Sequence, residues 1–137
     1  MISTQIHVKF NHIPAIQAQI RPAVSQVVRK TALGVEEDVK TEMRGPKSGR
    51  LYRRGGRTHQ ASAPGQAPAV DLGQLINSIQ VQNVTDLTST VGTNVEYAMP
   101  LEFGSRRMAP RPVWRSVIEK WRKPFTEAIT HVLRSLK

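Results

Sequence analysis

The chain has 137 residues, of which 39% are apolar and 5% aromatic, and its formal net charge is +10. This length favours one domain, and the apolar fraction allows only a modest hydrophobic core. The chain contains no cysteine, which excludes disulfides, thiolate metal sites and thiol nucleophiles. We therefore expect a single domain over residues 1–137, with some segments that depend on a partner for their stability.

The positive charge is concentrated in two stretches. Residues 44–57 hold six Lys and Arg and no acid, and residues 105–123 hold seven against one Glu, whereas residues 58–104 contain no Lys or Arg. This segregation predicts basic faces that attract a polyanion or an acidic neighbouring subunit. Because arginine forks suit both phosphates and carboxylates, the sequence leaves both partners open, beside a plain solvated basic face.

The chain is expected to begin with a strand and a long helix. Residues 4–10 alternate apolar and polar side chains, which is typical of a half-buried strand. Asn11 is a suitable cap for a helix in which apolar residues recur every three or four positions from Ile13 to Met43. A Gly-Pro pair should end this helix, and Pro22 is expected to kink or restart it.

Residues 45–70 are rich in Gly, Pro, Ser, Arg and Gln and are the least core-like part of the chain. Gly55 and Gly56 lie between two short extended stretches, which predicts a hairpin turn. Two-stranded hairpins without support are marginally stable in water. We therefore expect an extended basic arm that another subunit, or nucleic acid, stabilises.

A short helix and a second hairpin should follow the arm. Asp71 is expected to cap the helix, with Gln74 completing a capping box. Residues 79–84 and 89–96 alternate as two strands around a polar turn, which favours an antiparallel pair.

The last part of the chain is predicted to be helical. Residues 96–103 suggest one or two helical turns that Gly104 ends. A terminal helix with apolar residues every three or four positions follows an Arg-rich loop, and Pro124 is expected to kink it. The expected fold class is α+β: a small antiparallel sheet packed by a long N-terminal helix and a C-terminal helix, with an extended β-hairpin arm.

No pattern in the sequence supports catalysis. The four histidines are scattered without the spacing of a metal site, and no Gly-x-Ser-x-Gly element occurs. Residues 45–50 lack the spacing of a phosphate-binding loop. No run of about 18 apolar residues and no signal-like N-terminus is present. We therefore expect no enzyme activity, no cofactor, no metal and no membrane span.

From residue 45 onward the succession of motifs resembles the siphophage neck and tail-component family, whose members lie between the head-closure and major tail genes. The segments that carry this resemblance are SGRLY (48–52), HQASAPGQAP (59–68), DLGQLINSI (71–79), VG (91–92), YAMPLEFG (97–104) and MAPRP (108–112). They span about half of the chain.

The resemblance implies an α+β structural subunit without catalysis, assembled in a ring, with sixfold symmetry, at the head-proximal end of the tail. Its partners would be copies of itself, neighbouring head-closure or connector proteins, tail proteins and, without sequence preference, the packaged DNA. It would be made in the host cytoplasm and end in the virion. Neck, tail-completion and tail-terminator stations stay open. The positions carried over as fold-and-assembly positions are Gly73, Leu75, Ser78, Tyr97, Glu102, Phe103, Gly104, Pro110, Arg111 and Pro112.

Two sets of residues are the candidate interfaces. Glu102 is expected to meet an arginine such as Arg111, on this subunit or the next. The residues expected at subunit interfaces are Arg50, Tyr52, Arg53, Arg54, Arg57, Pro64, Pro68, Glu102 and Arg111. The residues that would face DNA in the ring lumen are Arg106, Arg107 and Arg115. The alternative function is a sequence-nonspecific DNA-binding protein of phage or host, and a small enzyme is a third option without a supporting constellation.

Overall fold

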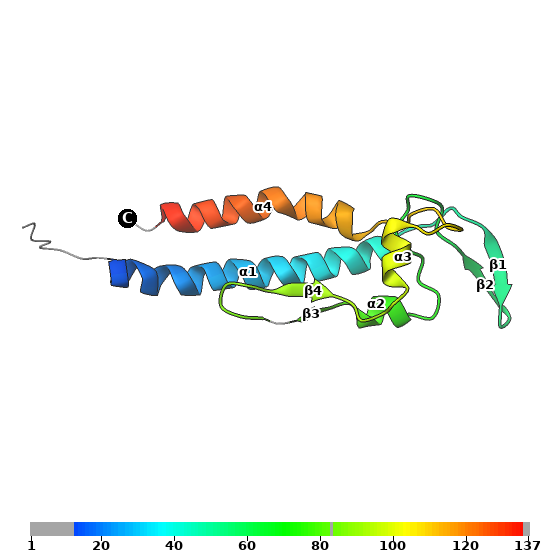
Figure 1. Ribbon diagram of the computed structural model, residues 1–137, viewed down its shortest axis with the longest axis horizontal. Coiled ribbons are helices and arrows are strands. Elements are labelled where there is room, and N and C mark those ends of the chain that lie inside the picture. Colours follow the sequence, from blue (N-terminus) through cyan, green and yellow to red (C-terminus); the bar gives the residue numbers. More distant parts are fainter. Residues whose placement is uncertain (1–12, 83, 136–137) are drawn as a thin grey trace, which may run out of the picture.

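Two long helices form an elongated body in the computed structural model, which describes residues 13–82 and 84–135 (Figure 1). α1 (Ile13–Arg44) and α4 (Trp114–Arg134) pack side by side and run in opposite directions. Two small antiparallel hairpins and two short helices complete the chain. The predicted α+β class, with its long N-terminal and C-terminal helices, is confirmed.

The proline positions inside the long helices do not divide them. α1 continues from Ile13 to Arg44 through Pro22, and Pro124 lies inside α4. Of the two predicted outcomes, a kink or a restart at Pro22, the restart was wrong, because α1 is one continuous helix through this residue. The predicted strand over residues 4–10 and the cap at Asn11 lie outside the described residues.

The hydrophobic core is small and lies toward one end of the body. It joins the last turns of α1 to the first turns of α4 and to α2 (Gln74–Ser78). The buried apolar residues of this cluster are Val39, Met43, Leu75, Ile76, Ile79, Val113 and Val117. Beyond it, Gly34 lets α1 approach α4, since a Cβ there would lie 2.3 Å from ring atoms of Trp121.

The strands form two separate two-stranded sheets. β1 (Leu51–Arg54) pairs with β2 (Arg57–Gln60), and the turn between them has positive φ at both Gly55 and Gly56, which confirms the predicted hairpin. β3 (Gln80–Gln82) pairs with β4 (Thr90–Gly92) along α1, which confirms the second predicted hairpin with shorter strands.

The short helices begin and end through glycines. α2 starts after Gly73, which has a φ of 79°, so the prediction that Asp71 caps this helix was wrong. The carboxylate of Asp71 binds an arginine of the first hairpin instead. α3 (Ala98–Phe103) ends at Gly104 as expected, where a φ of 82° lets the backbone N–H donate to the carbonyl of Pro100.

The surface of the molecule is large for its mass. The accessible area is 10580 Å², whereas a compact protein of 15.3 kDa exposes about 7,100 Å². Residues outside the described ranges account for at most about 2,400 Å² of this, the area of that much extended chain. The described residues therefore expose more surface than a compact monomer would.

Candidate functional site

The first basic stretch and the beginning of the second lie at one end of the molecule. The first hairpin and the loop between α3 and α4 lie together there, far from the beginning of α1 and the end of α4 (Figure 1). The backbone N–H of Gly65, which follows the first hairpin in the chain, donates to the carbonyl of Pro110 in this loop at 2.9 Å. Five arginines at this end are exposed and have no ion pair among the described residues: Arg50, Arg53, Arg57, Arg106 and Arg107. This end is therefore strongly positive.

The projecting part of the predicted arm is shorter than residues 45–70. Its strands extend to residues 49–61 through paired backbone bonds, and we call this segment the hairpin. Ala67 and Val70 pack against the core, and Pro68 is buried. The predicted interface residue Pro64 is exposed in a turn that precedes this packed stretch.

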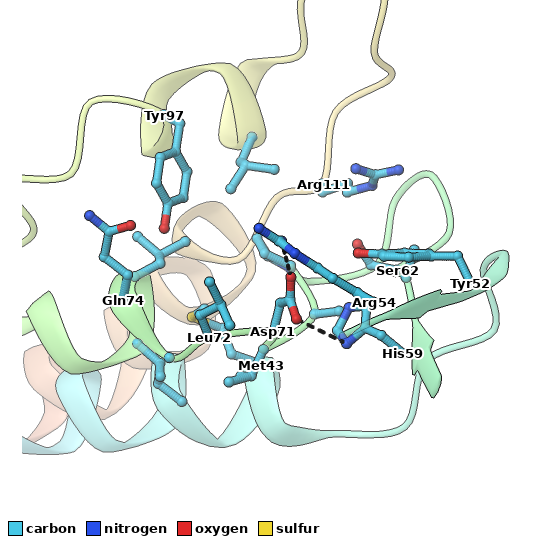
Figure 2. A pocket seen from close by; sticks show the side chains of 18 residues that line it. Met43, Tyr52, Arg54, His59, Ser62, Asp71, Leu72, Gln74, Tyr97 and Arg111 are labelled. Carbon is cyan, nitrogen blue, oxygen red and sulfur yellow. Dashed lines mark hydrogen bonds and ion pairs between the residues drawn. The ribbon is translucent and has the colours of Figure 1, made fainter. Parts of the chain in front are cut away.

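The hairpin has an inner and an outer face. Tyr52 pairs with His59 and Arg54 with Arg57, so these four residues share the inner face. Tyr52, Arg54 and His59 line a cavity against the rest of the molecule (Figure 2). The rings of Tyr52 and His59 meet edge to face, with centroids 5.1 Å apart. Leu51 and Arg53 belong to the outer face and are exposed.

One carboxylate faces both strands of the hairpin. Asp71 lies in the loop before α2, and its Oδ2 is 2.6 Å from Nη1 of Arg54 on β1. Its Oδ1 is 3.9 Å from Nδ1 of His59 on β2 (Figure 2). Protonated His59 would add a second ion pair to the same carboxylate. We call Asp71 and the cavity beside it the seat.

The packing between the hairpin and the seat is incomplete. The cavity has a volume of about 360 Å³ and is open on one side. Apolar side chains of α1, α2 and α3, among them Met43, Leu75 and Leu101, form its floor. Tyr97, a position carried over from the family resemblance, lies on its wall and is partly exposed.

The side chain of Gln66 links the two segments that flank the hairpin, at Ser48 and Ala63, and we call this place the root of the hairpin. Its Oε1 accepts hydrogen bonds from the backbone N–H groups of Ser48, at 3.1 Å, and Ala63, at 2.9 Å. Glycine is needed at position 49, beside these hydrogen bonds, because a Cβ there would lie 2.5 Å from the carbonyl oxygen of Ala61. The two ends of the hairpin are thus held together at the point where it leaves the body.

The predicted pairing of Glu102 with Arg111 within the chain was wrong. Glu102 is 8% exposed, and its carboxylate accepts hydrogen bonds from the backbone N–H groups of Val113, Trp114 and Arg115 at 2.8, 3.1 and 3.0 Å. These groups begin α4 and have no partner within the helix. Glu102 therefore caps α4 from outside the helix.

Arg111 has no carboxylate partner among residues 13–82 and 84–135. Its Nη1 donates to Sδ of Met108 at 3.3 Å, and its buried Nε has no hydrogen-bond partner. Its side chain lines the cavity of the seat. The third predicted lumen residue, Arg115, lies in the first turn of α4 and lines a separate hollow instead.

That separate hollow is largely apolar. It has a volume of about 450 Å³ between β4, α3 and α4. Phe103, another carried-over position, is 60% exposed on its rim beside Met99 and Ile118. Ser78, by contrast, has a structural role, since its Oγ lies 2.5 Å from Oγ1 of Thr93.

The body is held by charged contacts that the sequence pattern did not indicate. Asp38 of α1 accepts hydrogen bonds from Nε1 of Trp121, at 2.7 Å, and from Nζ of Lys120, at 2.9 Å. The hydrogen bond from Lys120 is the largest cause that lowers the pKa of Asp38. Lys40 likewise lowers the pKa of Glu36, which also accepts a hydrogen bond from the backbone N–H of Val81. These contacts join α1 to α4 and to β3.

Within the described residues, no cluster of His, Asp and Glu side chains could hold a metal ion, and no described helix is long and apolar enough to cross a membrane. Comparisons of the chain with models of protein families, with curated proteins and with solved structures find no match.

Proposed function

We propose that this protein is a non-enzymatic structural subunit of a tailed bacteriophage, one of several copies in a ring that joins head to tail around the DNA channel. The observation that carries the proposal is the basic hairpin, which projects from an elongated body and is almost wholly exposed. A two-stranded hairpin of this kind is only marginally stable by itself, and it would gain stability by packing on a neighbouring subunit.

The distribution of apolar side chains supports assembly with other proteins. The core is small for the chain, and the described residues expose more area than a compact monomer does. Large apolar residues are exposed on the hairpin, before α2 and around the hollow beside α3; they include Leu51, Leu72, Met99, Phe103 and Ile118. Contacts between subunits would cover these groups.

The five unpaired arginines of the hairpin end support contact with DNA. Repeated around a ring, they would attract phosphates from every side of the channel. Their contacts would be made to the backbone, would weaken with salt and would not read sequence, so DNA could still slide. Of the predicted lumen residues, Arg106 and Arg107 lie in the loop between α3 and α4, which is found at this end of the molecule.

The station at the head–tail junction rests on the family resemblance of residues 45–112. In that setting the ring has sixfold symmetry and contacts head-closure or connector proteins on one side and tail proteins on the other. The protein is then a virion component that is made in the host cytoplasm, with no cofactor and no catalytic residue.

A sequence-nonspecific DNA-binding protein is the second candidate. The same unpaired arginines favour it, because they give a monomer a positive surface without any assembly. Binding of the isolated monomer to duplex DNA at physiological salt, with no ring formed on a tail tube, would favour this candidate over the first.

The direct test removes charge from the hairpin and leaves the ion pair of the seat intact. We expect the triple substitution Arg50→Ser, Arg53→Ser and Arg57→Ser to leave normal heads and normal tails that fail to join, as counted by electron microscopy of lysates. The matched control replaces three exposed arginines of the helical body, Arg21, Arg29 and Arg134, by Ser. Unimpaired joining by the hairpin variant would remove the hairpin from the mechanism.

A further inference from the structure

The attachment of the hairpin to its own seat is complementary but slight. Arg54 and His59, one on each strand, face the single carboxylate of Asp71. The side chain of Arg54 is 61% exposed, and an ion pair that is so open to water contributes little stability. The cavity of about 360 Å³ beside it shows that apolar packing between hairpin and seat is incomplete.

The connections of the hairpin allow it to move as a unit. Residues 45–48 and 62–66 join it to α1 and to the packed stretch around Pro68, and they contain no helix and no strand. The bonds that shape it, the β1–β2 ladder and those between residues 49–50 and Ala61, lie within the hairpin itself. Reorientation of residues 49–61 about the root held by Gln66 would therefore break the contacts with the seat, while Ala67 and Val70 stay packed against the core.

We infer that the seat receives the hairpin of a second copy of this chain in the assembled ring, in place of the chain's own hairpin. This inference rests on the proposed self-assembly and names the surface that one protomer offers to the next. Every contact that Tyr52, Arg54 and His59 make with their own seat is available in identical form on a neighbour. Exchange therefore loses no contact and adds the surface that the two bodies cover between them.

Because the contacts are the same within a chain and between chains, the local concentration of the hairpin decides which form is populated, and a subunit stays monomeric before assembly. A tethered hairpin has an effective concentration at its own seat on the order of millimolar, far above the concentration of other copies in dilute solution. Docking on a tail or a closed head places neighbours side by side and removes that advantage. The hairpins then exchange in a closed, head-to-tail sense, each protomer giving one and receiving one.

Charge reversal separates exchange from self-contact. In the variant Arg54→Asp the hairpin repels its own seat, and in the variant Asp71→Arg the seat repels its own hairpin. Neither variant can form the ion pair alone, within a chain or between chains. In an equal mixture, each hairpin finds a seat of opposite charge only on the other variant.

We expect the mixture to associate. In sedimentation velocity at roughly 100 to 300 µM, it should contain about tenfold more two-chain species than either variant alone, which corresponds to about 1.4 kcal/mol in the free energy of association. The double variant Arg54→Asp with Asp71→Arg restores the pair within one chain and should remain monomeric. The matched control mixes Asp71→Arg with Arg53→Asp, the same charge change on the outer face of the same strand, and should not associate.

A mixture that stays monomeric over this range, while circular dichroism shows both variants to be folded, would overturn the exchange. That result would leave the proposed ring intact, because joining by the wild-type protein is scored separately in phage particles. Conversely, association of the mixed variants together with normal joining by the hairpin charge variant would retain the exchange and remove the arginines of the hairpin from the proposed joining mechanism. Association of the Arg53→Asp control to the same extent would also overturn the inference, since the contact would then not involve the seat.

Discussion

Replacing Glu102 tests whether this carboxylate holds the start of α4 or serves another subunit. In Glu102→Gln, the carbonyl oxygen can keep the hydrogen bonds from Val113 and Trp114, which both reach Oε2. The new NH₂ group then faces the backbone N–H of Arg115, so two donors meet and the third bond is lost. The negative charge that favours a helix N-terminus is lost as well.

The expected cost follows from these contacts. A hydrogen bond to a charged group contributes about 1.5–3 kcal/mol, and a charge near a helix end about 0.3–1 kcal/mol. Because Gln retains two weaker bonds, we expect Glu102→Gln to lower the free energy of unfolding by about 2 kcal/mol. Glu102→Ala leaves three amide groups without their acceptor and should cost about 3–4 kcal/mol.

Urea unfolding followed by circular dichroism measures both values, with an unchanged m-value as the sign that the folded and unfolded states are comparable. Glu96→Gln is the matched control, because Glu96 is exposed in the same part of the chain, and it should change stability by less than about 0.5 kcal/mol. If Glu102→Gln is as stable as the control but prevents ring formation, the carboxylate serves a neighbouring subunit and the reasoning is refuted.

Two further changes test the helical body. Gly34→Ala should destabilise the fold by about 1–3 kcal/mol in thermal unfolding, because the new Cβ at position 34 would lie 2.3 Å from the ring of Trp121, although Ala favours helices. A gain in stability would contradict this prediction. Gly92→Ala is the control, because a Cβ at Gly92 would have no atom within 4 Å. The lowered pKa of Asp38 means that its charge stabilises the fold above its ordinary pKa of 3.8 and that this contribution is lost as the pH falls through the lower folded value. Asp38→Asn, which removes the pair with Lys120, should therefore lower stability at pH 7 and flatten its dependence on pH below 3.8, as urea titrations at a series of pH values would show.

Several features of this fold follow from local patterns in the sequence. The period of three and four in α1 and α4 and the alternation around the second turn each depend on a few neighbouring residues, and those predictions are confirmed. Gly55, Gly56 and Gly104 mark a turn and a helix end because positive φ is favourable for glycine and costly for other residues. The positive charge of the hairpin is likewise visible in the sequence.

The predictions for individual carboxylates fared differently. Asp71 has the spacing of a helix cap, yet it binds Arg54, which lies 17 residues earlier. Glu102 was expected to pair with Arg111, but it caps α4 by accepting from residues 11 to 13 positions later. In each case the prediction used residues that are near in the sequence, whereas the carboxylate accepts hydrogen bonds from donors that the fold brings close.

The sequence by itself determined which segments are helical or extended, where two turns lie and how charge is distributed, because backbone sterics and side-chain period act over a few residues. The tertiary structure alone decided that the hairpin and the loop holding Arg106 and Arg107 share one end, and that Asp38 reaches Trp121 across 83 residues. An acid bonds to the donor that is nearest in space, and that choice is fixed only when α1 and α4 pack together.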